Sequence, residues 1–235
     1  MIYAVLILVL SYVLGSIPTG YWIAKAVKGI DIRQFGSGST GATNVWRCVG
    51  KKEGAFVFVF DILKGYCPVA FSVWLDAGAM AEQWNSFAIP HLVPALVAFA
   101  PLIGHSKSIF LDFQGGKSAA TGLGTLFGLN PLAGLCTLVS WFSLVGLTKI
   151  VSLSSMVAVV IATIAFIVLQ APVPFTAYCA CGSAYVIYRH RANIKRLLNG
   201  TEPRLGDKPK ELNEPKIKQP QVDGQSEAAT ADPSK

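Results

Sequence analysis

Two stretches of the chain combine glycine with hydroxyl and cationic side chains. The first reads GSGSTGATN over residues 36–44 and is followed by Arg47. The second reads FQGGKS over residues 113–118, with Lys117 at the start of an apolar run. Glycines let consecutive backbone N–H groups turn toward one anion, and hydroxyls and a cation add further donors. A helix N-terminus with a lysine beside it forms a related kind of phosphate site. Both stretches therefore predict phosphate binding.

Neither stretch is a nucleotide motif in its expected context. The first matches GxGxxG, but a dinucleotide fold needs a strand before the glycines and a βαβ unit around them. Here an apolar run containing Asp61 follows instead. The second lacks the first Walker glycine, since Leu111 stands at that position. Plainer interpretations stay open for both: a flexible linker for the first, and an interfacial snorkelling residue for Lys117.

Two further segments carry polar side chains beside apolar runs. Residues 149–155, KIVSLSS, place Ser152 and Ser154 where they either contact a ligand or cap the next helix. Residues 189–196, RHRANIKR, place His190 and Asn193 three positions apart, on one face if the preceding helix continues. Basic residues accumulate in the cytoplasmic loops of membrane proteins, which explains the arginines of this segment. This rule does not explain a histidine and an asparagine placed together.

The elements that position these segments are predicted to be membrane helices. Only 14% of the residues are charged, against about a quarter in soluble domains. Apolar runs, most of them near the ~20 residues that cross a bilayer, occupy 2–24, 54–75, 87–104, 118–129, 132–147, 153–169 and 173–189. We predict an all-α integral membrane protein with about seven transmembrane helices, or five or six if short runs re-enter or merge. The fourth run is rich in glycine and alanine, which favours tight helix packing.

The charges of the connections predict an orientation. Lys and Arg fill the connections after the first, third, fifth and seventh runs, and the intervening connections hold none. Because basic loops stay inside, the N-terminus is predicted outside, with the motif loops and the C-terminus in the cytoplasm. We expect one membrane-embedded catalytic domain over residues 1–202 and a disordered polar tail over 203–235. Asp61 and Lys64, three positions apart within the second run, are expected to pair and to shape the site.

Several function classes lack support. The net charge of +7 is scattered among loops and forms no basic stripe, so no nucleic-acid partner is expected. The five cysteines form an odd set without CxxC pairs, so no metal site is expected. The main rival to an enzyme is a transporter for a phosphate-bearing solute. Against it, the chain shows no evident inverted repeat, and its polar motifs gather on one face. A purely structural scaffold gives no reason for paired Gly–Ser–Lys loops.

Taken together and in order, these phrases resemble the bacterial acyl-phosphate:glycerol-3-phosphate acyltransferase family. The resemblance covers residues 15 to about 205 and rests on GSIPTG at 15–20, residues 36–50, DILKG at 61–65, Gly104-His105, FQGGK at 113–117, VSL at 151–153 and residues 190–202. Two positions depart from the family pattern: Ser39 replaces asparagine and keeps a donor, and Lys149 replaces arginine and loses the bidentate fork.

The resemblance implies transfer of a fatty acyl group from acyl phosphate to the 1-hydroxyl of sn-glycerol 3-phosphate, the first step of phospholipid synthesis. The products are lysophosphatidate and inorganic phosphate. It also implies a multi-pass protein of the bacterial plasma membrane, with its active site facing the cytoplasm and membrane lipid around it. No cofactor is expected, and the enzyme is expected to work as a monomer.

The same resemblance assigns the candidate site. Expected catalytic residues are Ser37, Arg47, Lys117, His190 and Asn193; expected substrate-binding residues are Gly36, Gly38, Gly41, Thr43, Asn44, His105, Gly115, Gly116, Ser152 and Ser154. No covalent nucleophile stands beside a recognisable base, so direct transfer is expected. The hydroxyl proton goes either to His190 as general base or to a substrate phosphate, whose second pKa is about 6. In the second case His190 positions a ligand.

Overall fold

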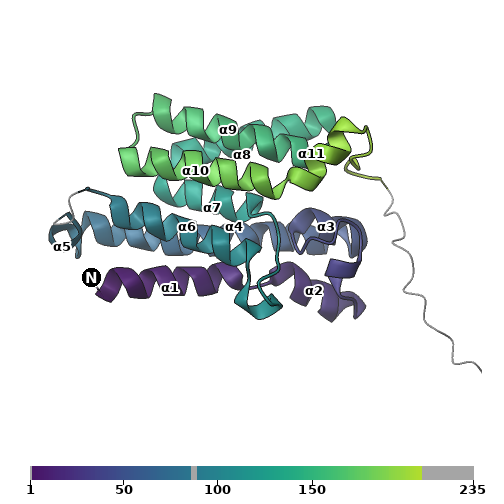
Figure 1. The fold of residues 1–235 in the computed structure, drawn as a ribbon, viewed down its shortest axis with the longest axis horizontal. Helices are drawn as coiled ribbons and strands as arrows, with labels where there is room; N and C mark the ends of the chain where they lie inside the picture. The colour runs from purple at the N-terminus through teal and green to yellow at the C-terminus, as the bar shows by residue number, and fades with distance from the viewer. Residues whose placement is uncertain (1, 86–88, 208–235) are drawn as a thin grey trace, which may run out of the picture.

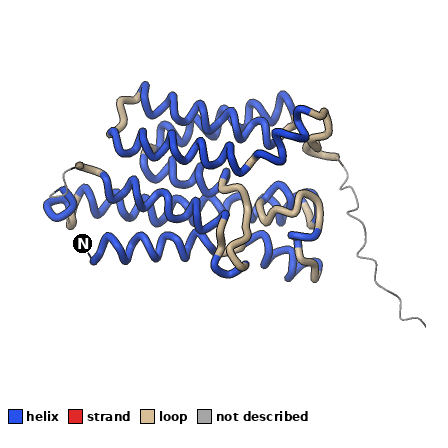
Figure 2. Tube along the Cα trace, in the orientation of Figure 1, coloured by secondary structure: helices blue, strands red, loops and turns tan. Residues whose placement is uncertain are grey.

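The computed structural model describes residues 2–85 and 89–207, and these residues form helices, turns and loops without a β-strand (Figures 1 and 2). The helices are α1 (Ile2–Ser16), α2 (Thr19–Lys28), α3 (Ala42–Cys48), α4 (Lys51–Ala77), α5 (Ala81–Asn85), α6 (Leu92–Ser106), α7 (Ala119–Leu129), α8 (Pro131–Thr148), α9 (Val151–Val168), α10 (Val173–Arg189) and α11 (Arg191–Leu198). Short 3₁₀ turns occupy Ile32–Gln34 and Ile109–Leu111.

The all-helical class and the membrane character agree with the prediction. Every one of the predicted apolar runs contains a helix. Within the described residues, four segments are long and apolar enough to cross a membrane: Ile2–Lys28, Lys51–Ala77, Pro131–Thr148 and Val151–Val168. Apolar side chains such as Val5, Leu10 and Ile164 are more than half exposed, which suits faces that contact lipid. The count of seven spans and the orientation stay predictions.

The first apolar run is divided into two helices. Pro18 has no backbone N–H and disfavours helix in the residue before it, so α1 ends at Ser16 and α2 begins at Thr19. The break exposes the carbonyl of Ile17 inside the bundle. The Lys64 ammonium of α4 donates to this oxygen at 2.8 Å and lies 2.8 Å from the carboxylate of Asp61. The predicted Asp61–Lys64 pair is therefore present, and it also stabilises the helix break.

Helix α7 packs directly against α4 through a glycine. A side chain at Gly124 would lie 2.0 Å from the carbonyl oxygen of Ile62, so only glycine allows this close approach. The predicted tight packing of the glycine-rich run is confirmed. In Figure 1, α7 lies between a lower group of α1, α4 and α6 and an upper group of α8, α9 and α10. The short helices α2, α3 and α11 gather at the end opposite the N-terminus.

The predicted tail boundary differs from the structure. Composition places residues 203–207 in the polar tail, yet the Leu205 N–H donates to the carbonyl of Lys149 at 2.7 Å. One backbone hydrogen bond thus ties this segment to the turn between α8 and α9. The remainder of the predicted tail, 208–235, lies outside the described residues.

Candidate functional site

A cavity of about 1130 Å³ opens between α4 on one side and α8 and α9 on the other, with α7 behind it. Its two ends differ in chemistry. Charged and polar side chains line the end nearest the short helices, and they come from α3, α9, α11 and the loops before α3, before α7 and on both sides of α11: Ser37, Thr43, Arg47, Lys117, Ser152, His190, Asn193, Arg196 and Glu202. Apolar side chains line the other end: Phe58, Leu123, Leu126, Trp141, Phe142, Val145, Ala158 and Val159. The cavity therefore suits a ligand with an anionic head and an apolar chain.

The loop before α3 is organised by one buried amide. Asn44 is 2% exposed, and its Nδ2 donates to the carbonyls of Phe35 and Ser39 at 2.9 Å each. Its Oδ1 accepts the Ser37 backbone N–H at 2.9 Å. Gly36 has φ +59°, and a side chain there would meet the Asn44 amide at 2.2 Å. The hydrogen bonds of Asn44 therefore fix the conformation of this loop from its buried side. The side chains of Ser37 and Arg47 line the cavity.

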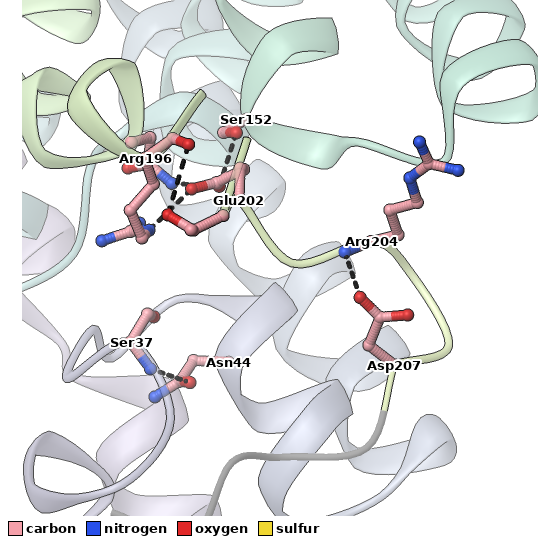
Figure 3. A network of polar contacts seen from close by, with 9 residues as sticks. Ser37, Asn44, Ser152, Arg196, Glu202, Arg204 and Asp207 are labelled. Atoms are coloured by element: carbon pink, nitrogen blue, oxygen red, sulfur yellow. Dashed lines mark hydrogen bonds and ion pairs between the residues drawn. The ribbon is translucent and has the colours of Figure 1, made fainter. Parts of the chain in front are cut away.

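The opposite wall is organised by one carboxylate. Glu202 Oε1 accepts hydrogen bonds from Ser152 Oγ and Asn193 Nδ2 at 2.6 Å each, and Oε2 accepts from Arg196 Nε at 2.7 Å. Burial raises the pKa of Glu202, but these hydrogen bonds and the Arg196 charge outweigh burial and lower it. Figure 3 shows Ser152, Arg196 and Glu202 of this cluster above the Ser37–Asn44 pair. Glu202 therefore joins α9, α11 and the segment after α11 at the polar end.

His190 is held as a neutral imidazole at this end. It is 4% exposed, and its Nδ1 lies 2.8 Å from the carbonyl of Val186. A carbonyl only accepts, so Nδ1 carries the proton and Nε2 is left as an acceptor. Burial lowers the pKa of His190 to about 4, and the nearby Lys117 charge acts in the same direction. The ring can therefore accept a hydrogen bond from a hydroxyl but is a weak proton acceptor at neutral pH.

The Lys117 loop is fixed by backbone contacts on both sides. The N–H of Gly116 donates to the carbonyl of His105 at 3.0 Å, and Arg189 donates to the Gly116 carbonyl at 2.9 Å. The His105 ring lies 3.6 Å from Asp61, so the buried pair of α4 also supports this loop. Burial, and after it the charge of Arg196, lowers the pKa of Lys117 to about 8. A dianionic ligand would offset that desolvation.

The apolar end is closed by an aromatic contact between helices that otherwise do not pack closely. The rings of Phe58 in α4 and Trp141 in α8 stack with their centroids 5.3 Å apart. The Trp141 indole also donates to Ser155 of α9 at 3.0 Å. These three side chains line the cavity. An alkyl chain bound there would contact a wall of rings and aliphatic groups.

The structure brings most of the predicted residues to this cavity. Those that line it are Gly36, Ser37, Gly41, Thr43, Asn44, Arg47, His105, Lys117, Ser152, His190 and Asn193. Gly38 and Gly115 line a separate, smaller cavity, and Gly116 packs against the His105 ring. Ser154 is fully buried and donates to the carbonyl of Ile150 in its own helix turn. Ser154 therefore neither lines the cavity nor caps α9, whose N-cap residue is Ile150.

Two residues of the site, Arg196 and Glu202, were missing from the predicted set. Both belong to the resembling C-terminal segment, but an arginine and a glutamate on either side of a glycine look like ordinary surface charges. Their spacing across Gly200, whose φ is +67°, is the signal that could have found them. Cys48, a thiol among the polar loops, has a pKa raised by burial, which disfavours it as a nucleophile.

Comparison with known proteins places the chain in a family. A family model described as glycerol-3-phosphate acyltransferase matches residues 5–200. The glycerol-3-phosphate acyltransferase of Trichormus variabilis is 47% identical over 208 residues, covering 86% of this chain and 92% of the relative. A second glycerol-3-phosphate acyltransferase, from Rhizobium johnstonii, is 46% identical and covers 85% and 94%.

Solved structures give the same result. The crystal structure of PlsY (YgiH), an integral membrane glycerol 3-phosphate acyltransferase, in its glycerol 3-phosphate form has a TM-score of 0.77 and 38% identity, covering 87% of this chain and 96% of that one. Its lysophosphatidic acid form has a TM-score of 0.74 and 37% identity, covering 86% and 95%. This chain belongs to the glycerol-3-phosphate acyltransferase family.

Proposed function

We propose that this protein transfers a fatty acyl group from acyl phosphate to the 1-hydroxyl of sn-glycerol 3-phosphate, giving lysophosphatidate and phosphate. The observation that carries the proposal is the two-ended cavity, with cations at one end and apolar side chains at the other. The site would face the cytoplasm of a bacterial plasma membrane, and one copy of the chain contains all the lining residues named above. The solved relatives were crystallised in glycerol 3-phosphate and lysophosphatidic acid forms, which supports this acceptor and this product.

The charges at the polar end suit two phosphate groups. Arg47, Lys117 and Arg196 provide three cations, of which Arg196 is paired with the Glu202 carboxylate at 2.7 Å. A phosphate monoester carries about −1.5 to −2 at pH 7. Arg47 comes from α3 and Lys117 from the loop before α7, so the two cations can contact different phosphates or share one. The backbone N–H groups of the first loop and the hydroxyl of Ser37 supply neutral donors to the same anions.

The reaction needs alignment more than acid–base power. Acyl phosphate is a mixed anhydride, so attack by the 1-hydroxyl oxygen on the carbonyl carbon forms the ester and breaks the bond to the phosphate oxygen. The carbonyl oxygen becomes negatively charged on the way, which Lys117 or Arg47 can stabilise. We propose that His190 Nε2 accepts a hydrogen bond from the 1-hydroxyl and orients it. The proton then passes to a substrate phosphate, because its second pKa of about 6 exceeds that of His190.

The donor is tested with purified protein in detergent micelles. Labelled glycerol 3-phosphate is mixed with palmitoyl phosphate, palmitoyl coenzyme A or palmitoyl acyl-carrier protein in parallel, and lysophosphatidate is measured. We expect product only with palmitoyl phosphate, together with one equivalent of inorganic phosphate. Product from a thioester alone would contradict the proposed donor. Because micelles enclose no compartment, turnover there also excludes the transporter alternative as the explanation of the site.

Direct transfer is tested separately. Protein is mixed with labelled palmitoyl phosphate in the absence of glycerol 3-phosphate, then denatured and analysed by intact-mass spectrometry. Direct transfer predicts no added acyl mass on the chain. An acylated serine or cysteine that forms as fast as turnover would overturn it while leaving the overall reaction intact.

A further inference from the structure

A second cavity, of about 170 Å³, lies beside the same glycine loops but shares no lining residue with the main cavity. Gly38 of the first loop and Gly115 of the second line it. Three basic side chains also line it: Arg33, Lys107 and Arg189. None of these cations belongs to the proposed transfer site. The cavity is therefore a distinct basic pocket on the outer side of both loops.

The basic side chains of this pocket are only partly compensated. Arg33 is paired with Asp31 at 2.7 Å, and Asp112 lies near enough to Arg33 to raise its pKa further. Lys107 is exposed, and its ammonium has no hydrogen bond or ion pair within residues 2–85 and 89–207. Arg189 donates one hydrogen bond, to Gly116, while its buried Nε has no partner among the same residues. Because buried donors are normally satisfied, the Arg189 guanidinium can donate to an anion in this pocket.

Exposed apolar and aromatic side chains lie beside the polar lining of the pocket. Phe113 lines it and is 56% exposed, and Ile109 and Phe110 of the same loop are about half exposed. Trp22 of α2 is half exposed as well, with its ring centroid 6.3 Å from that of Phe110. Exposed aromatic rings beside a lysine are typical of the membrane–water interface. An anion presented at that depth, with alkyl chains attached, is a phospholipid head group.

We propose that this pocket binds the phosphate group of an anionic phospholipid, whose acyl chains lie against Ile109 and Phe110. Lys107 reaches the phosphate from the rim, and Arg189 reaches it from inside. Arg189 also holds the carbonyl of Gly116, the residue before Lys117. A bound head group therefore stabilises the loop that carries Lys117 without entering the main cavity. This effect on the loop rests on the proposed function, whereas the lipid binding does not.

The test uses the full chain in nanodiscs of phosphatidylcholine with a rising fraction of phosphatidylglycerol, and it measures the thermal unfolding midpoint. We expect phosphatidylglycerol to raise the midpoint of the wild type. Lys107→Ala should need about a fivefold larger fraction for half of the effect, since one cation near an anionic surface contributes about that much. Lys52→Ala is the matched control, because Lys52 is exposed at the start of α4 and lines neither cavity.

A second arm separates the lipid from free phosphate. Inorganic phosphate is added to the same variants in nanodiscs of pure phosphatidylcholine. The proposal holds if the Lys107-dependent rise appears with phosphatidylglycerol and is absent with inorganic phosphate. It is overturned if Lys107→Ala responds to phosphatidylglycerol as the wild type does, or if the Lys107-dependent rise occurs only with inorganic phosphate. Unfolding needs no turnover, so failure of the donor assay leaves this result readable.

Discussion

The two walls of the polar end are built by opposite means. On the α3 side, the neutral amide of Asn44 satisfies two backbone carbonyls and one N–H of a single local loop. On the α11 side, the carboxylate of Glu202 gathers Ser152, Asn193 and Arg196 from separate segments. The first wall shapes a backbone cradle, whereas the second positions side chains. A neutral network should therefore be insensitive to pH, and an ionic one should depend on its single negative charge.

The largest effect is expected at Asn44. Asn44→Asp keeps the size of the side chain but turns a buried carboxylate toward the carbonyls that now accept from the amide. An unpaired buried charge costs about 3–5 kcal/mol, so the variant should unfold at a much lower temperature and lose turnover. Ser39→Ala is the control in the same loop, because its Oγ accepts only the Gly41 N–H, at 3.3 Å. Comparable losses in both variants would refute the organising role of the amide.

Glu202→Gln should weaken the other wall by less. The amide keeps the shape and one acceptor, but the bonds from Ser152, Asn193 and Arg196 lose their charge assistance. Bonds to charged groups contribute about 1.5–3 kcal/mol and neutral ones about 1 kcal/mol, so a net loss near 2 kcal/mol is expected in denaturant unfolding.

The same variant tests the ionic character by pH. Because the pKa of Glu202 is lowered in the folded protein, its contribution is present above the unfolded value near 4.5 and is lost as the pH falls through the folded value. The wild-type advantage over Glu202→Gln should therefore shrink on acidification below that pH. Glu82→Gln, at the opposite end of the bundle in α5, should change neither the stability nor its pH dependence.

Lys117 stands between the walls and should give the clearest pH profile of activity. With the pKa of Lys117 lowered to about 8, kcat/KM for acyl phosphate should fall by about tenfold as the pH rises past that value. Both substrate phosphates are already dianionic at that pH. The decrease in kcat/KM is therefore caused by a group of the protein and not by the substrates. Lys117→Arg stays charged and should show a flat profile over the same range. A fall of the same size in Lys117→Arg would show that another group titrates and would contradict the role of Lys117.

The smallest effect distinguishes two neighbouring serines of α9. Ser152 donates to Glu202, whereas Ser154 donates to the carbonyl of Ile150 in its own turn. Ser152→Ala should lower turnover several-fold, because it removes one charge-assisted hydrogen bond, about 1.5 kcal/mol of support, from the ionic wall. Ser154→Ala should leave turnover within experimental error. The reverse order of effects would show that α9 presents a different face to the substrates.

The sequence predicted the helical class and most of the residues named at the polar end of the cavity, because membrane helices and glycine loops leave strong local signals. The first apolar run shows the limit of hydropathy, since Pro18 divides it and Lys64 of another helix satisfies the exposed carbonyl of Ile17. Three of the glycines expected to bind substrate do not line the main cavity, because tertiary packing decides which way a loop faces. Gly38, Gly115 and Gly116 look like phosphate contacts in sequence, but packing turns them toward a second pocket or toward His105.

Arg196 and Glu202 were missed because their role is created by tertiary contacts. Nothing local in RLLNGTE, residues 196–202, says that its glutamate will meet Ser152 and Asn193. The turn at Gly200 folds the glutamate back onto α11, and this geometry appears only once α9 and α11 are packed. Side chains that hold other side chains in place leave weaker sequence signals than those that touch a ligand.

The most direct test of the account is an experimental structure of this protein with a non-hydrolysable palmitoyl phosphonate bound. The account predicts the phosphonate oxygens within hydrogen-bonding distance of Lys117 Nζ and the Arg47 guanidinium. It also predicts the alkyl chain between α4 and α8, in contact with Phe58 and Trp141. A phosphonate seated in the pocket of Lys107 and Arg189, or a chain lying outside the large cavity, would contradict it.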